Sequence, residues 1–199
     1  MLVGISGAGK STWAASLAQR VTAAGKRKEP TSRNNAATAA AAATGSPLAQ
    51  QRAALPLATE DELVATLAAL PELRVVSSDD IRRRVAGRVD AFHRDQEVFA
   101  ALHRDVHDAL RRGHGVVVDA TNLLAASRAA FAGGLPASCR RFAKVFDCSV
   151  AEARRRIDRD VAAGADRTAT PTDVLRRQDN QLGFDPAGAL RAEGWTLIA

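Results

Sequence analysis

The first residues of the chain form a pattern that suits phosphate binding. Residues 4–11 match G-x-x-x-x-G-K-S/T without a gap, between an apolar run and a predicted helix. Glycines let such a loop wrap around a phosphate with its backbone N–H groups turned inwards, and the helix adds its positive end. Lys10 would reach the outer phosphates of a nucleotide, and the Ser11 hydroxyl would ligate Mg²⁺. We expect the phosphates to be bound by Gly4, Ser6, Gly7, Ala8, Gly9, Lys10, Ser11 and Thr12.

Two acidic groups follow later predicted strands. Asp79 opens a helix after the second strand and has Arg82 one turn further on, whereas Asp119 ends the third strand. Ligands bind at the carboxyl edge of open parallel sheets, so both groups are expected near the phosphate-binding loop. Asp79 can accept the proton of an attacking hydroxyl while Arg82 holds a substrate phosphate. Asp119 can hold a magnesium-bound water or fix Arg82. For Asp79 the alternative is an acidic residue that only favours the N-terminus of a helix. For Asp119 the alternative is a simple turn after a strand.

A third group is rich in arginine. Residues 154–159 read Arg-Arg-Arg-Ile-Asp-Arg, and Arg155 and Arg159 share one helical face. A mobile lid over residues 150–170 would stabilise charge during phosphoryl transfer. A solvated helix with Asp partners is the alternative, and spacing does not choose among Arg155, Arg156 and Arg159.

Composition narrows the class of protein. The chain has 199 residues, of which 46% are hydrophobic, which predicts one domain with a real core. Two cysteines without metal-type spacing exclude a disulfide scaffold and favour a reducing, cytoplasmic location. No apolar run is long enough to cross a membrane. The net charge is +6 and the pI is near 10.3, which would attract polyanions such as nucleic acid, unless an Arg-rich composition is simply a genomic habit.

Apolar strands alternate with helices along the chain, which predicts a three-layer α/β fold with a parallel sheet of about five strands. We expect residues 25–58 to interrupt this order as a low-complexity, mobile insertion. Capping-box spacing at Thr59 and Ser149 predicts two helix starts. A longer helix over about 95–112 is expected to bury Val98, Phe99, Leu102, Val106 and Leu110. The strands are expected at 1–6, 73–76, 115–119, 142–146 and 195–198, with further helices at about 10–24, 60–70, from 79, 125–132, 149–163 and 171–182.

The known classes of phosphate-loop protein differ in their other motifs. The chain lacks the Asn-Lys-x-Asp run of guanine-specific GTPases and the strand ending in adjacent acids that mechanical ATPases use. A kinase is therefore favoured over a switch or a motor.

With these motifs in order, the sequence resembles the polynucleotide 5′-kinase family. The resemblance rests on residues 4–13, Ser-Asp-Asp-Ile-Arg at 78–82, Val-Asp-Ala-Thr-Asn at 118–122, Val-Phe-Asp at 145–147 and Pro-Thr-Asp-Val-Leu-Arg at 171–176. It implies a P-loop kinase that uses ATP and Mg²⁺ to phosphorylate the 5′-hydroxyl of DNA or RNA. Asp79 would then be the general base, and Arg82 would bind the acceptor phosphate. Arg155 and Arg159 would be the paired lid arginines.

Two other functions remain open from the sequence. A small-molecule kinase of the same superfamily suits the scarcity of base-stacking residues, since the chain has two Trp, six Phe and no Tyr. A nucleotide-binding module without transfer activity is the third reading. The insertion departs from the family pattern, and the oligomeric state does not follow from the sequence.

Overall fold

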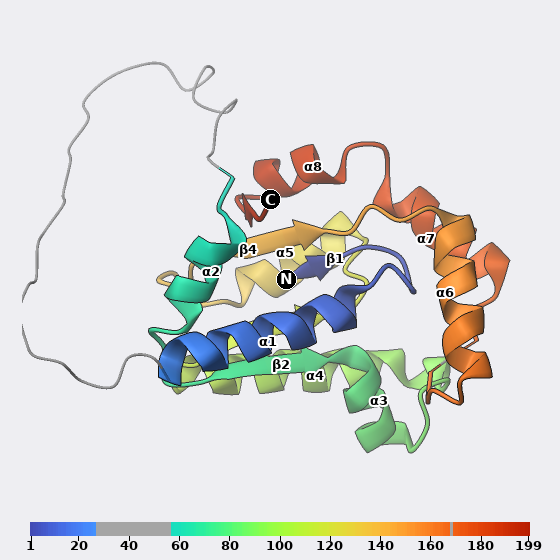
Figure 1. Ribbon diagram of the computed structural model, residues 1–199, viewed down its shortest axis with the longest axis horizontal. Helices are drawn as coiled ribbons and strands as arrows, with labels where there is room; N and C mark the ends of the chain where they lie inside the picture. The colour runs from blue at the N-terminus through green and yellow to red at the C-terminus, as the bar shows by residue number, and fades with distance from the viewer. Residues whose placement is uncertain (27–56, 168) are drawn as a thin grey trace, which may run out of the picture.

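A parallel sheet forms the centre of the computed structural model, which describes residues 1–26, 57–167 and 169–199 (Figure 1). One ladder joins two strands and another joins three, and the two meet just beyond β1 and β3. There the Gly4 N–H donates to the Thr121 carbonyl at 3.2 Å. The order across the sheet is β2-β3-β1-β4-β5, which confirms the predicted fold class. The strand bounds are β1 (Leu2–Val3), β2 (Leu73–Ser77), β3 (Gly115–Asp119), β4 (Phe142–Val145) and β5 (Thr196–Leu197).

The register of two strands brings the acidic groups together. Ser77 lies opposite Asp119 where β2 and β3 end, and Asp79 follows in the first turn of the next helix. Asn122 adopts a positive φ of 49°, and its side chain donates to the Leu2 carbonyl at 2.7 Å. The loop after β3 is thereby tied to β1, which leads into the phosphate-binding loop.

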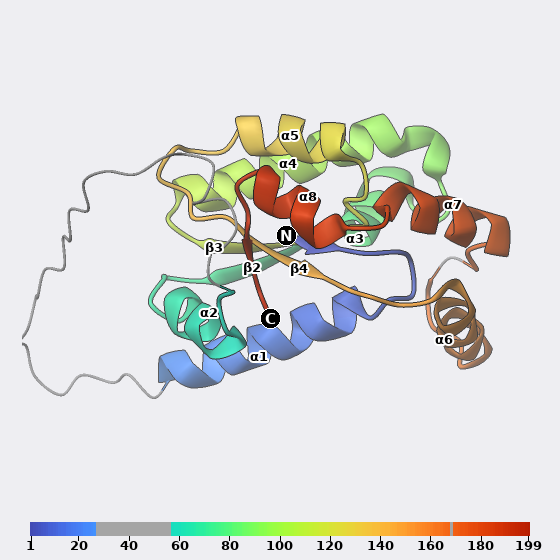
Figure 2. The same ribbon diagram turned by 90° about the horizontal axis from the view of Figure 1, so that it is seen from above.

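Helices cover both faces of the sheet. Figure 2 shows α1 and α2 on one side and α4, α5 and α8 on the other. Leu2 and Val117 pack with α1 and α2, whereas their neighbours Val3 and Val118 pack on the opposite face. This alternation explains why both faces of β1 and β3 are apolar. The helix bounds are α1 (Lys10–Lys26), α2 (Glu60–Leu67), α3 (Ser78–Ala86), α4 (Asp95–Arg111), α5 (Ala125–Gly133), α6 (Val150–Ala162), α7 (Thr172–Leu182) and α8 (Pro186–Ala192).

A third apolar cluster supports the phosphate-binding loop. Ile5 and Ala8 of the loop are buried against Ala153 and Ile157 of α6 and against Leu175 of α7. Figure 1 places α6 and α7 at the end of the sheet to which this loop projects. The two helices therefore form one wall of the site.

The helix starts agree with the capping signals, with one difference. Thr59 forms the full capping box with Glu62. Ser149 accepts from the Glu152 N–H at 3.2 Å, but the Glu152 carboxylate pairs with Arg155 and Arg156 instead of returning to the cap. Arginines one turn away compete successfully for that carboxylate.

Some expectations about the elements were wrong. Phe99 is 38% exposed and does not lie on the buried face of α4. The sequence reasoning also missed α8, although Asp185 caps it and Pro186 occupies its first turn.

The insertion predicted at 25–58 lies outside the described residues over 27–56. Within the described part of the chain, no helix is long and apolar enough to span a membrane.

Candidate active site

The phosphate-binding loop joins β1 to α1 and touches α6. Gly7 has a φ of +81°, and a Cβ atom built on it would lie 2.8 Å from the Ala153 carbonyl oxygen. Any side chain would therefore be strained by the backbone and would collide with α6. On its other side the Ser6 N–H donates to Oε1 of Gln178 in α7 at 2.8 Å. The loop is thus held between α6 and α7.

Lys10 begins α1 and is buried beneath the loop. Its Nζ donates to the Gly4 carbonyl at 3.0 Å and to the Ile5 carbonyl at 2.8 Å. Burial lowers the pKa of Lys10 to about 8, although the nearby carboxylates of Asp119 and Asp79 act in the opposite direction. A buried ammonium that is held only by carbonyls gains when phosphate oxygens replace them.

A cavity of about 920 Å³, which we call the phosphate cavity, opens beside the phosphate-binding loop. It brings Gly7, Gly9, Lys10, Ser11, Thr12, Asp79, Asp119 and Arg159 from the sequence-predicted set into one site. The predicted residues Gly4, Ser6, Ala8, Arg82 and Arg155 do not line it. Gly4 and Ala8 are buried parts of the loop backbone, and a cradle made of N–H groups does not need their side chains.

Asp119 and Ser11 form a pair at the floor of the cavity. Asp119 is 6% exposed, and burial raises the pKa of its carboxyl, while a hydrogen bond with the Ser11 side chain lowers it. A buried carboxylate beside a hydroxyl offers two oxygen donors, which is the ligand chemistry that Mg²⁺ prefers. The residues therefore fit a magnesium ion that is completed by waters and nucleotide phosphates. Asp119 does not contact Arg82, so the alternative role of fixing that arginine is not what the structure shows.

Asp79 of α3 lines the cavity, and its carboxylate accepts a hydrogen bond from Arg82. Arg82 is 5% exposed and donates to Asp79 Oδ1 at 2.9 Å and to Asp95 Oδ1 at 2.7 Å. The Asp79 side chain is 60% exposed and remains accessible to a substrate. Arg82 does not line the cavity, and both of its terminal nitrogens are engaged, so in this structure it positions Asp79 instead of facing an acceptor phosphate.

The arginines of α6 point in different directions. Arg159 lines the cavity, as does Arg156, whose Nη1 donates to the Ala8 carbonyl at 3.3 Å. The Arg155 side chain is 68% exposed and pairs with Glu152 at 2.5 Å, outside the cavity. The structure therefore places Arg156 and Arg159 together in the site, and Arg155 away from it. Spacing alone did not separate Arg155, Arg156 and Arg159, because Arg159 lies one helical turn from both of the other two.

Sequence reasoning also missed the contacts across the mouth of the cavity. Arg83 of α3 donates through Nε to Asp166 at 2.7 Å and through Nη2 to the Asp166 carbonyl at 2.8 Å. Arg167 pairs with Asp160. Arg83 lies beside the motif residue Arg82, which was the available signal, but no pattern indicated its partner 83 residues away.

Comparison with known families identifies the class of domain. A family model described as an AAA domain (AAA_33) matches residues 61–184, which is more than half of the 199-residue chain. The match includes Asp79, Asp119 and the whole of α6, while the phosphate-binding loop precedes it. A search of curated proteins gave no match. The chain therefore belongs to this AAA domain family and is a nucleotide-binding domain of the P-loop superfamily.

Proposed function

We propose that the protein is an ATP-dependent kinase that phosphorylates the 5′-hydroxyl of a polynucleotide. The observation that carries the proposal is the accessible carboxylate of Asp79, held in the same cavity as Lys10 and the Ser11–Asp119 pair. A site that only bound nucleotide would have no use for an exposed carboxylate positioned by a buried arginine. P-loop kinases gain most of their rate from such positioning and charge stabilisation.

The reaction follows from these positions. Asp79 accepts the proton of the acceptor hydroxyl, whose oxygen forms a bond to the γ-phosphorus as the bond to the ADP oxygen breaks. Lys10 and the loop N–H groups would bind the phosphates, and Ser11 and Asp119 would hold Mg²⁺, which neutralises charge on them. Arg156 and Arg159 would stabilise the charge that develops on the transferred group.

An exposed aromatic ring supports a nucleic-acid acceptor. Phe92 is 54% exposed, and the Arg82 guanidinium lies 5.1 Å from the centre of its ring. Arg82 in turn holds Asp79, so an open aromatic face is joined to the candidate base through one side chain. A nucleobase next to the reacting hydroxyl could stack on this face. The small-molecule alternative has no such contact in its favour.

The test is transfer of labelled γ-phosphate from ATP and Mg²⁺ to a short oligonucleotide with a 5′-hydroxyl. The same oligonucleotide with a 5′-phosphate is the matched negative control, and nucleosides and sugars are parallel acceptors. We expect label only on the 5′-hydroxyl oligonucleotide, and none with Asp79→Asn, which should still bind ATP. Label on a small acceptor alone would overturn the polynucleotide assignment. ATP binding without any labelled product across the acceptors would favour the non-catalytic module.

A further inference from the structure

The acceptor of the proposed kinase brings a phosphate of its own into the site. In a polynucleotide, a phosphate joins the sugar that carries the 5′-hydroxyl to the next sugar, and an arginine fork is the side chain that best fits such a group. Arg82 does not line the phosphate cavity, and its two terminal nitrogens bind Asp79 and Asp95. Another cation must therefore hold the acceptor phosphate.

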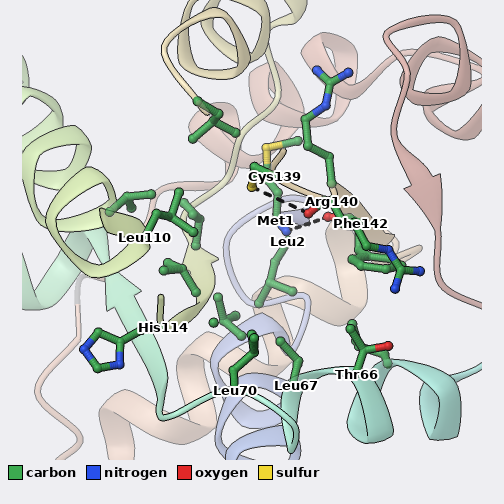
Figure 3. A pocket seen from close by; sticks show the side chains of 18 of the residues that line it. Met1, Leu2, Thr66, Leu67, Leu70, Leu110, His114, Cys139, Arg140 and Phe142 are labelled. Atoms are coloured by element: carbon green, nitrogen blue, oxygen red, sulfur yellow. Dashed lines mark hydrogen bonds between the residues drawn. The ribbon is translucent and has the colours of Figure 1, made fainter. Parts of the chain in front are cut away.

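A second cavity, of about 420 Å³, offers no route to the candidate base (Figure 3). It is lined by residues where strands begin, such as Leu2 and Phe142, whereas the phosphate cavity forms where β2 and β3 end. Among the described residues, its lining includes none from α3 or α6, and it shares only Trp13 with the phosphate cavity. The contacts of the acceptor are therefore expected in the phosphate cavity.

Arg83 lines the phosphate cavity from the same helix as the candidate base. It follows Asp79 by four residues, so the two lie on one face of α3, about 6 Å apart along the helix axis. The other arginines that line this cavity, Arg156, Arg159 and Arg167, come from α6 and the segment after it. Because Arg83 and Asp79 share one helix, a group bound by Arg83 is kept at a nearly constant distance from the base.

Two oxygens of one residue occupy the guanidinium fork of Arg83. Its Nε donates to Oδ2 of Asp166 at 2.7 Å, and its Nη2 donates to the Asp166 carbonyl at 2.8 Å, while its Nη1 pairs with Asp80. Two oxygens of a phosphate bind the same two adjacent nitrogens of an arginine fork. The Asp166 side chain is 75% exposed, so water screens its bond to Arg83 and its replacement costs little.

We propose that Arg83 binds the first internal phosphate of the acceptor, and that Asp166 competes with this phosphate for Nε and Nη2. The inference rests on the proposed kinase function and narrows its substrate class. Acceptors that carry a phosphate beside the sugar with the 5′-hydroxyl, such as an oligonucleotide or a nucleoside 3′-monophosphate, are preferred over a nucleoside.

The neighbouring charges allow this exchange. Asp80 remains on Nη1 and keeps the guanidinium of Arg83 oriented when Asp166 leaves. Asp160, which lines the same cavity from α6, is paired with Arg167, so its charge is compensated. The phosphate thus replaces one anion on Arg83 and adds no new uncompensated pair of like charges there.

The experiment measures phosphate transfer from ATP to a nucleoside, its 3′-monophosphate and a short 5′-hydroxyl oligonucleotide. We expect Arg83→Gln to raise the KM for the two phosphate-bearing acceptors at least about tenfold more than the KM for the nucleoside. Asp166→Asn should lower the KM for the same two acceptors by about two- to fivefold, because it weakens the competitor. Arg84→Gln is the matched control, since it removes the same charge from an exposed side chain outside the phosphate cavity.

A binding measurement makes the test independent of turnover. Fluorescence anisotropy without ATP compares a labelled 5′-hydroxyl oligonucleotide with one whose first linkage is a neutral methylphosphonate. We expect the unaltered protein to bind the natural linkage at least about tenfold more tightly. Arg83→Gln should remove this preference, and Arg84→Gln should keep it.

Several outcomes would overturn the proposal. Equal effects of Arg83→Gln and Arg84→Gln would show that only the net charge of α3 matters. Equal binding of the two linkages by the unaltered protein would show that this phosphate is not recognised. Loss of the preference in Arg82→Lys alone would return the role to Arg82, and an unchanged KM in Asp166→Asn would exclude the competition. The absence of labelled product with every acceptor would instead contradict the kinase assignment, and the anisotropy comparison would still decide the role of Arg83.

Discussion

Arg82 holds the candidate base Asp79 with a hydrogen bond of 2.9 Å and holds Asp95 with a second bond of 2.7 Å. The buried guanidinium thus links the first turn of α3 to the start of α4. Only one of its two carboxylate partners, Asp79, faces the phosphate cavity. Substitutions can therefore test the two bonds separately. The bond to Asp79 orients the candidate base, and the bond to Asp95 joins α3 to α4.

Arg82→Lys should lower kcat by about 10- to 100-fold with little change in the KM for ATP, because a single ammonium cannot hold both carboxylates in place. Asp95→Asn is the matched control, since it weakens the link to α4 but leaves the Asp79 bond intact. It should preserve most of kcat. Steady-state kinetics and thermal unfolding of both variants make the comparison. Equal losses of kcat in the two would mean that Arg82 acts only through the stability of the fold.

Arg156→Ala should lower kcat/KM by at least about tenfold, because this side chain lies in the cavity against the loop. Arg155→Ala, one residue away and exposed, should change it little. Phosphate transfer by the two variants is compared after circular dichroism and thermal unfolding have shown that both are folded to the same extent. The reverse order would show that α6 rotates before the reaction and presents its other face.

ATP affinity should depend on the protonation of Lys10. Its pKa of about 8 in this structure would rise when phosphate oxygens surround it, so binding should take up a proton near pH 8. Affinity should therefore fall as the pH rises above about 8, by at most about tenfold per pH unit. Calorimetry between pH 7 and 10, in two buffers with different ionisation enthalpies, measures both the affinity for ATP and the number of protons taken up. Lys10→Arg keeps its charge throughout and should lose this pH dependence, whereas a flat profile in the unaltered protein would contradict the prediction.

Acid should weaken the junction between α1, α2 and β4. Glu60 accepts from Trp13 at 2.7 Å and pairs with Arg20 and Lys144, and these contacts lower its pKa from 4.5 to about 2. Its contribution to stability is complete above about pH 4.5 and is lost as the pH falls towards 2.

Denaturant unfolding at pH 7 and pH 3 tests this junction. Glu60→Gln should lower the free energy of unfolding at pH 7, and the difference from the unaltered protein should shrink at pH 3. Asp61→Asn is the control, because that side chain is 95% exposed and its loss should matter little. An equal effect of Glu60→Gln at both pH values would exclude an electrostatic origin.

Phe92→Leu should raise the KM for an oligonucleotide by about fivefold or more while the KM for ATP stays constant, since stacking on one base is lost. Phe92→Tyr should retain the lower KM. Phe99→Leu replaces another exposed phenylalanine and serves as the control. If both leucine variants behave alike in oligonucleotide kinetics, Phe92 does not contact the acceptor.

The sequence predicted those parts of the site that depend on local chemistry. The loop around Lys10, the first helical turn at Asp79, the strand end at Asp119 and the helix start at Ser149 all follow from residue type and short spacing. Contacts between distant segments did not follow. Gln178 on Ser6 and Asp166 on Arg83 join residues 172 and 83 positions apart, and no local pattern encodes such pairs. The choice among Arg155, Arg156 and Arg159 needed the rotation of α6, which its packing against the loop determines.

The close approach of Gly7 to Ala153 also limits how the proposed lid can move. The first two turns of α6 are wedged against the phosphate-binding loop, with Ala153 and Ile157 fully buried there. They cannot swing outwards without pulling the nucleotide cradle apart. Any hinge must therefore lie beyond Ile157. The first half of α6 would then stay fixed against the loop, and Arg156 would keep its position beside it. In the proposed lid, the part free to open would be the segment that follows, where Asp166 contacts Arg83.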